Sequence, residues 1–155
     1  MNTSSSSLPT SVAWLGYGGL IPFVGLAIAG LVTAPGWHGT ITHALISYGA
    51  IILSFVGALH WGFATIRPEL PAGLRTQLFV WSVIPSLLAW AALLLVDHSA
   101  LGATTLLIAT FAAHLRQDVR LGQQAGMPEL PAWYLPLRAR LTLVAILSLL
   151  VNAAV

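Results

Sequence analysis

Two histidines, His60 and His114, are the side chains whose placement best suits cofactor binding. Each ends an apolar segment, and both are expected at the same depth on one side of a membrane. Neutral imidazole is a common axial ligand of haem iron, and it can also hydrogen-bond a quinone headgroup. The pair is therefore a candidate site for b-type haem or quinone. The alternative is that each imidazole hydrogen-bonds a neighbouring carbonyl or a lipid headgroup at the membrane interface.

The other polar residues form no recognisable catalytic set. The four carboxylates, Glu69, Asp97, Asp118 and Glu129, all fall in predicted loops, and no serine sits in a Gly-x-Ser-x-Gly context. The absence of cysteine excludes disulfides, thiolate metal sites and iron–sulfur clusters. A formal net charge of +2 is too small to indicate nucleic-acid binding. We therefore expect neither an enzyme nor a metal site, and no nucleic-acid partner.

The composition is that of a protein dissolved in lipid. Of the 155 residues, 57% are hydrophobic and only 6% are charged, whereas soluble domains contain about 25% charged residues. Because backbone groups in hydrocarbon must be satisfied within their own segment, the long apolar runs are predicted to be helices. The sequence thus predicts an all-α integral membrane protein. Residues 1–11 form a serine-rich tail expected to be disordered, and residues 12–155 form one transmembrane domain.

Five apolar segments are predicted to cross the membrane, at about residues 12–32, 41–64, 77–96, 100–115 and 141–155. The fourth, at roughly 16 residues, is short enough to be re-entrant. With five spans, however, all six arginines lie on the side that carries the N-terminus. The positive-inside rule then places the N-terminus in the cytoplasm and the C-terminus outside.

The second predicted span carries small residues at every fourth position, namely Ala50, Ser54, Ala58 and Gly62. Such residues let helix backbones approach closely in lipid. We expect this ridge to face other helices and the second span to be the centre of the bundle. Pro22 and Pro85 are predicted to kink the first and third spans.

The loop before the last span contains three prolines and is expected not to form a regular helix. Trp133 and Tyr134 within it are expected to anchor the loop at the membrane interface, where amphipathic rings are favoured.

Several sequence blocks resemble a bacterial and mitochondrial family of unknown function, the family that includes mitochondrial transmembrane protein 69. The blocks are Gly19-Leu20-Ile21-Pro22-Phe23 and the segments 48–62, 81–90 and 133–138. The resemblance covers about residues 14–150. It implies a small five-span inner-membrane protein with its basic loops in the cytoplasm or matrix, and it supplies no activity. The motif positions that it marks, besides His60, are Tyr48, Ser54, Trp61, Gly62, Pro85, Trp133, Tyr134 and Arg138.

Together these observations predict a multi-pass protein of a bacterial cytoplasmic membrane. Its expected role is that of a non-enzymatic accessory or assembly partner of a larger membrane complex, without a cofactor. Its expected partners are the lipid bilayer and another membrane protein or a second copy of itself. The alternative role is that of a redox-associated protein that binds haem or quinone through His60 and His114.

Overall fold

The computed structural model describes residues 7–124 and 130–155, and within these ranges every regular element is a helix. The elements are α1 (Thr10–Gly18), α2 (Ile21–Val32), the short 3-10 helix η1 (Pro35–Trp37), α3 (His38–Ile66), α4 (Ala72–Leu95), α5 (Ala100–Gly122) and α6 (Tyr134–Ala153). The predicted disordered tail lies partly outside the described residues, and α1 already begins at Thr10.

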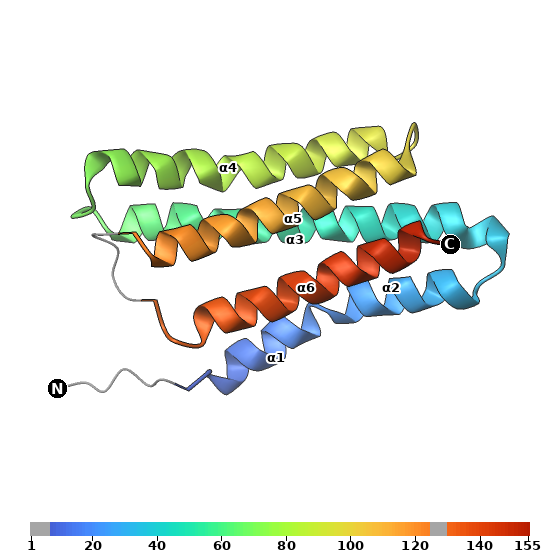
Figure 1. Cartoon of the computed structure of the whole chain (residues 1–155), viewed down its shortest axis with the longest axis horizontal. Coiled ribbons are helices and arrows are strands. Elements are labelled where there is room, and N and C mark those ends of the chain that lie inside the picture. The colour runs from blue at the N-terminus through green and yellow to red at the C-terminus, as the bar shows by residue number, and fades with distance from the viewer. Residues whose placement is uncertain (1–6, 125–129) are drawn as a thin grey trace.

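The helices lie side by side along the long axis of the molecule (Figure 1). Helices α1 and α2 follow one another as one broken rod, and each later helix reverses direction. The ends of α3 and α5 therefore meet the beginnings of α1, α4 and α6. We call this the arginine-bearing end, because all six arginines lie within or beside these helix termini. Helix α3 contacts α2, α4, α5 and α6, so it is the central helix that the sequence predicts.

Four segments of the described chain are long and apolar enough to cross a membrane: residues 10–32, 35–66, 72–95 and 134–153. Helix α5 is not among them, although its 23 residues would extend about 35 Å at 1.5 Å per residue. Its last nine residues include His114, Arg116, Asp118 and Arg120, which lower its mean hydropathy. The predicted all-α membrane class is confirmed, and α5 extends seven residues past the predicted boundary at 115, to Gly122.

The first rod is interrupted at Gly19 and Leu20, where the sequence predicts only a kink. Pro22 occupies the second position of α2, in the first turn, where a missing N–H breaks no helical hydrogen bond. The Tyr48 hydroxyl of α3 donates a hydrogen bond of 2.8 Å to the Gly19 carbonyl. Tyr48 therefore satisfies a backbone group at the break, which explains a polar residue in this apolar helix.

The prediction that the proline-rich loop excludes a regular helix is wrong for its last part. Helix α6 begins at Tyr134 and contains Pro136 as its third residue. The N–H groups of a first turn have no intrahelical acceptors, so proline is tolerated there. Residues 125–129 of that loop lie outside the described residues. Pro85, by contrast, is inside α4, which continues through it to Leu95.

The predicted small-residue ridge does not face other helices of this chain. Ala50 is buried, but Ser54, Ala58 and Gly62 are exposed, so the packing prediction is wrong for these three. A four-residue step overshoots a full helical turn by about 40°, so the ridge rotates by roughly 120° between Ala50 and Gly62 and leaves the bundle. The close approach is made at Gly57, where an added Cβ would lie 2.8 Å from the Ser82 backbone oxygen of α4.

Candidate functional site

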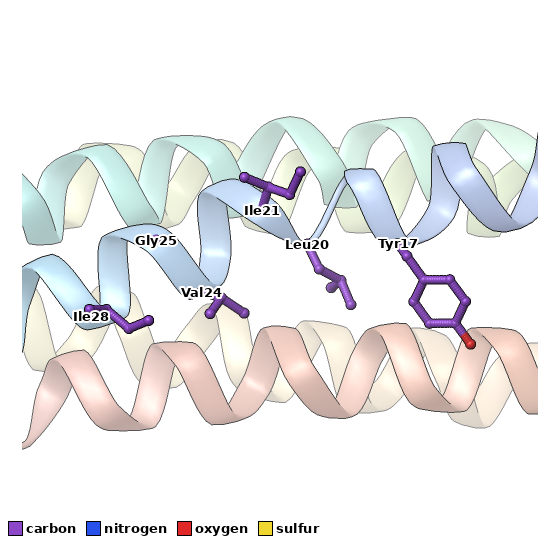
Figure 2. A pocket seen from close by; sticks show the side chains of 6 residues that line it. All are labelled: Tyr17, Leu20, Ile21, Val24, Gly25 and Ile28. Atoms are coloured by element: carbon purple, nitrogen blue, oxygen red, sulfur yellow. The ribbon is translucent and has the colours of Figure 1, made fainter.

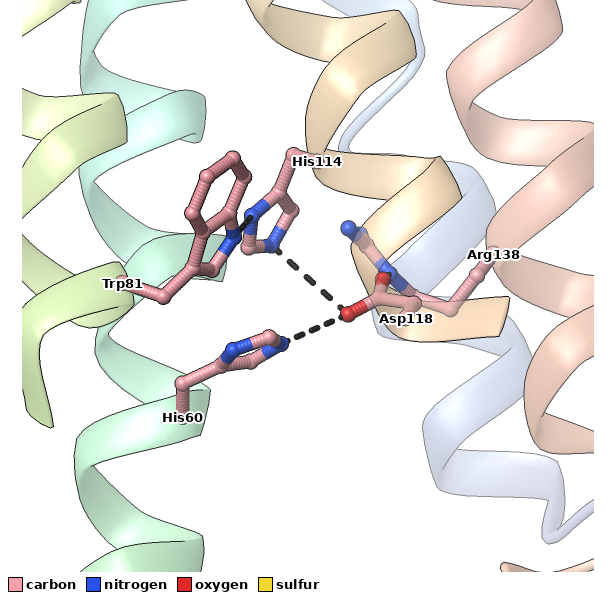
Figure 3. Close-up of polar contacts among 5 residues, drawn as sticks. All are labelled: His60, Trp81, His114, Asp118 and Arg138. Carbon is pink, nitrogen blue, oxygen red and sulfur yellow. Dashed lines mark hydrogen bonds and ion pairs between the residues drawn. The ribbon is translucent and has the colours of Figure 1, made fainter. Parts of the chain in front are cut away.

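The structure brings His60 and His114 together around a buried carboxylate at the arginine-bearing end (Figure 3). His60 comes from α3, and His114 and Asp118 lie one turn apart on α5. Arg138 enters from the first turns of α6 and Trp81 from α4. Four helices thus contribute to one polar cluster, which we call the Asp118 cluster.

Both oxygens of Asp118 are occupied within the cluster. His60 Nε2 lies 2.8 Å from Oδ1, and Arg138 Nε donates to Oδ2 at 2.8 Å. His114 Nε2 lies 3.9 Å from Oδ1. Asp118 and the two histidines are at most 1% exposed, and Arg138 is 8% exposed. A buried charge is strongly unfavourable unless it is paired. The Asp118 carboxylate and the Arg138 guanidinium can therefore both be charged in the interior only because each neutralises the other.

The hydrogen-bond partners of the two histidines indicate which imidazole nitrogen of each carries the proton. The Trp81 indole N–H, which can only donate, lies 3.1 Å from His114 Nδ1. His114 Nδ1 must therefore accept, and a neutral His114 carries its proton on Nε2, the nitrogen that faces Asp118. His60 likewise places a proton on Nε2 to donate to the carboxylate. Asp118 thus receives hydrogen bonds from α3 and α6, while His114 Nε2 of its own helix, at 3.9 Å from Oδ1, faces it without a hydrogen-bond partner among the described residues.

This geometry does not fit the haem or quinone site considered from the sequence. The centroids of the His60 and His114 rings lie 5.0 Å apart, with 37° between the ring planes. Two axial histidines must face the iron from opposite sides of the porphyrin, whereas the Nε2 atoms of both rings point to the same side, toward Asp118 Oδ1 (Figure 3). Both imidazoles are fully buried, so neither reaches a quinone headgroup in the bilayer or a lipid headgroup at its surface.

His60, His114 and Asp118 also offer one potential metal-ligand atom each, and these atoms lie within 4.8 Å of one another. A metal-bound histidine, however, normally donates its second N–H to an acceptor. His114 Nδ1 faces a donor, and His60 Nδ1 has no hydrogen-bond partner among the described residues. The protonation pattern is that of a hydrogen-bonded ion pair rather than of a metal centre.

We therefore expect Zn²⁺ not to stabilise the purified protein. A site saturated at 100 times its Kd would add about 2.7 kcal/mol to the free energy of unfolding, which would raise the Tm by several degrees. The measurement is the Tm in detergent with and without excess ZnCl2, and a His43→Gln variant controls for binding at an exposed histidine. A rise in Tm that His114→Gln abolishes would contradict the ion-pair interpretation.

Of the residues that the family resemblance marks, His60 and Arg138 belong to the Asp118 cluster. Tyr48 lies at the break of the first rod, and Pro85 is buried where α4 meets Gly57. Tyr134 lies near the cluster, with its ring packed edge-on against Phe63 at 6.4 Å between centroids.

The remaining marked residues lie away from the cluster. Ser54 and Gly62 are exposed on α3, and the Ser54 hydroxyl bonds only to the Ala50 carbonyl one turn earlier. Trp61 is 53% exposed. Trp133, half-buried, precedes α6 and packs against the Tyr134 ring.

Sequence reasoning missed Asp118 and Trp81. The sequence predicts a loop at Asp118, because the apolar segment ends before Arg116. The sequence does hold a signal, because His114, Asp118 and Leu121 recur at helical spacing, on a face away from Arg116 and Arg120. The structure buries the first three and exposes the two arginines. Trp81 had no comparable signal, since a tryptophan near a membrane interface usually serves as an anchor.

Comparison with known proteins shows the family to which this chain is similar. The family described as a protein of unknown function, DUF3429, matches residues 8–154. The chain belongs to this family. The DUF3429 chain is 39% identical over 150 residues to Transmembrane protein 69 of Xenopus tropicalis and 31% identical over 145 residues to Transmembrane protein 69 of Mus musculus. These alignments cover 95% and 93% of the chain, so the resemblance noted in the sequence is confirmed.

The DUF3429 chain spans 56% of the length of each of these curated relatives. Their name agrees with the membrane character of the chain. Both are vertebrate proteins, which contradicts the prediction of a bacterial cytoplasmic membrane: the resemblance covered bacteria and mitochondria alike, and nothing in the residues distinguishes the two. No solved structure matches the chain.

Proposed function

We propose that this chain is a non-enzymatic accessory protein of a membrane complex. The observation that supports the proposal is that the Asp118 cluster is buried and that its hydrogen bonds are made within it. Its hydrogen bonds connect its own members, and its histidines and carboxylate are at most 1% exposed. A catalytic centre needs groups that reach a substrate, whereas these groups hold four helices together. The exposed helix faces carry many large apolar side chains, which a partner helix could contact.

In this proposal the chain crosses the bilayer five times, with the N-terminus on the cytoplasmic side. Helix α5 is the fourth crossing in chain order, because it lies alongside the other long helices and its polar residues His114 and Asp118 face inward. The antiparallel order puts every arginine at one end, and the positive-inside rule assigns that end to the cytoplasm or the equivalent compartment.

The face of α3 that carries Ser54, Ala58 and Gly62 is the proposed partner surface. These small residues are exposed, and an added Cβ at Gly62 would meet no atom within 4 Å. Ile51 and Phe55 beside them are 64% and 65% exposed. Small residues have no advantage against lipid, but they let a second helix approach closely. The partner is a helix of another membrane protein or of a second copy.

We expect Ala58→Leu to abolish the association without destabilising the chain. A leucine would fill the space that the partner backbone occupies, whereas Ala58 contacts no other helix of its own chain closely enough to be buried. The assay compares complexes from native membranes by native electrophoresis and compares the Tm of the purified protein in detergent. Ala112→Leu, at an exposed alanine of α5, is the matched control.

The absence of cysteine allows a direct test of the second-copy alternative. If the partner is a second copy, oxidation of a Ser54→Cys variant should give a disulfide-linked dimer. Unchanged complexes in Ala58→Leu would contradict the proposed surface, and a lowered Tm would show that Ala58 packs within the chain.

A further inference from the structure

Two apolar hollows lie along the broken first rod and continue into one another. The first, of about 430 Å³, runs along α1 and α2 from Tyr17 to Ile28. The second, of about 270 Å³, lies between α2 and α6 and extends to Leu31 and Val151. Both include Val24 and Ile28, so together they form one groove.

The groove has the length and orientation of a lipid chain. The fifteen residues from Tyr17 to Leu31, which are separated by fourteen helical rises, extend about 21 Å at 1.5 Å per rise. One leaflet contributes about 15 Å to the hydrocarbon core of a bilayer. The side chains of Tyr17, Leu20 and Val24 point from the broken rod toward α6 (Figure 2). The groove therefore runs parallel to the rods from the arginine-bearing end toward the opposite end.

A positively charged side chain lies at the Tyr17 end of this groove. The Arg140 guanidinium of α6 donates to the Tyr17 hydroxyl at 3.5 Å, and both side chains are exposed. Arg138, two residues earlier, points into the bundle and bonds to Asp118 instead. In the described ranges 7–124 and 130–155, no carboxylate lies within ion-pair distance of Arg140. Its charge is thus available at the level of the lipid headgroups.

We propose that this groove binds a phospholipid with an anionic headgroup. The phosphate bonds to Arg140 and the Tyr17 hydroxyl, and an acyl chain lies along Val24 and Ile28 toward Leu31. An apolar groove with a cation and a hydroxyl at its headgroup end matches both parts of such a lipid. A helix of a partner protein would match the apolar part alone. The site lies on α1, α2 and α6, and it is independent of the α3 face proposed for protein association.

The test uses the full chain in phosphatidylcholine vesicles that contain a small fraction of phosphatidylglycerol with a photoactivatable acyl chain. Mass spectrometry then locates the labelled peptides. We expect labelling of the α2 peptide with Val24 and Ile28 and of the α6 peptide with Val151, and competition by unlabelled phosphatidylglycerol. Arg140→Gln should lower this labelling about fivefold, the effect expected for one arginine at an anionic surface. Arg140→Lys should retain most of it.

Arg120→Gln, which removes an exposed arginine of α5 away from the groove, should leave the labelling unchanged. The parent chain is also compared with the same acyl chain carried on phosphatidylcholine, so the result does not depend on the folding of any variant. Equal labelling by the two lipids would overturn the proposal. Crosslinks from these peptides to a second protein chain would overturn it too, and would assign the groove to a protein partner.

Discussion

Replacing Asp118 with asparagine is expected to lower the free energy of unfolding by about 3–5 kcal/mol, the range measured when one partner of a buried ion pair is removed. The substitution keeps the size of the side chain but leaves the Arg138 guanidinium buried without a counter-ion. It also removes the anionic acceptor of His60 Nε2. The measurement is the Tm in detergent, supported by denaturant unfolding, and the decrease should be the largest of any single polar substitution in the chain.

Two comparisons make this prediction specific. Glu69→Gln breaks the exposed Arg67–Glu69 pair and should change stability by less than about 1 kcal/mol. The double variant Asp118→Leu with Arg138→Met removes both charges together and should recover much of the lost stability, because apolar residues can replace a buried pair. If Asp118→Asn melts like the parent chain, the carboxylate and the guanidinium are not coupled as the structure shows.

Gly57→Ala is expected to destabilise the contact between α3 and α4 by about 1–3 kcal/mol, as overpacking of a close contact typically does. The new Cβ would lie 2.8 Å from the Ser82 backbone oxygen and 3.5 Å from the Pro85 ring. A backbone oxygen cannot rotate away as a flexible side chain can, so the two helices must separate. The measurement is again the Tm in detergent.

Gly62→Ala provides the matched control on the same helix. It adds the same methyl group where no atom lies within 4 Å, and alanine is the better helix former, so stability should be unchanged or slightly raised. Equal effects of the two substitutions would mean that the loss of glycine itself, rather than the proximity of α4, determines the result.

Composition and spacing were sufficient to predict the helical membrane class and the central position of α3. They did not locate the side of α3 that contacts its neighbours, because a four-residue repeat of small residues drifts around the helix. In the sequence, Ser54, Ala58 and Gly62 have the spacing of a helix-packing surface. The face of α3 that is buried against its neighbours instead contains Gly57 and His60. Only the positions of the other helices distinguish these two faces.

The pairing of His60 with His114 was predictable, because both lie near the same end of neighbouring helices. The carboxylate that both face is indicated only by its helical spacing from His114 and Leu121, and the arginines on either side of it indicate a loop instead. Arg116 and Arg120 are exposed on one side of α5, while His114 and Asp118 are buried on the other. The identity of the cluster as an ion pair also depends on Arg138, twenty residues further along the chain.

The polarity of α5 has a consequence for the biogenesis of the protein. Alone among the long helices of the described chain, α5 is not apolar enough to cross a membrane by its own composition. Asp118 is acceptable in hydrocarbon only when Arg138 of α6 and His60 of α3 reach it. In the proposed five-crossing arrangement, α3 precedes α5 in synthesis but α6 follows it, so we expect α5 to stay near the membrane surface until α6 has been made. We therefore propose that α5 and α6 enter the bilayer together, and we expect a chain truncated before Arg138 to leave α5 outside the membrane.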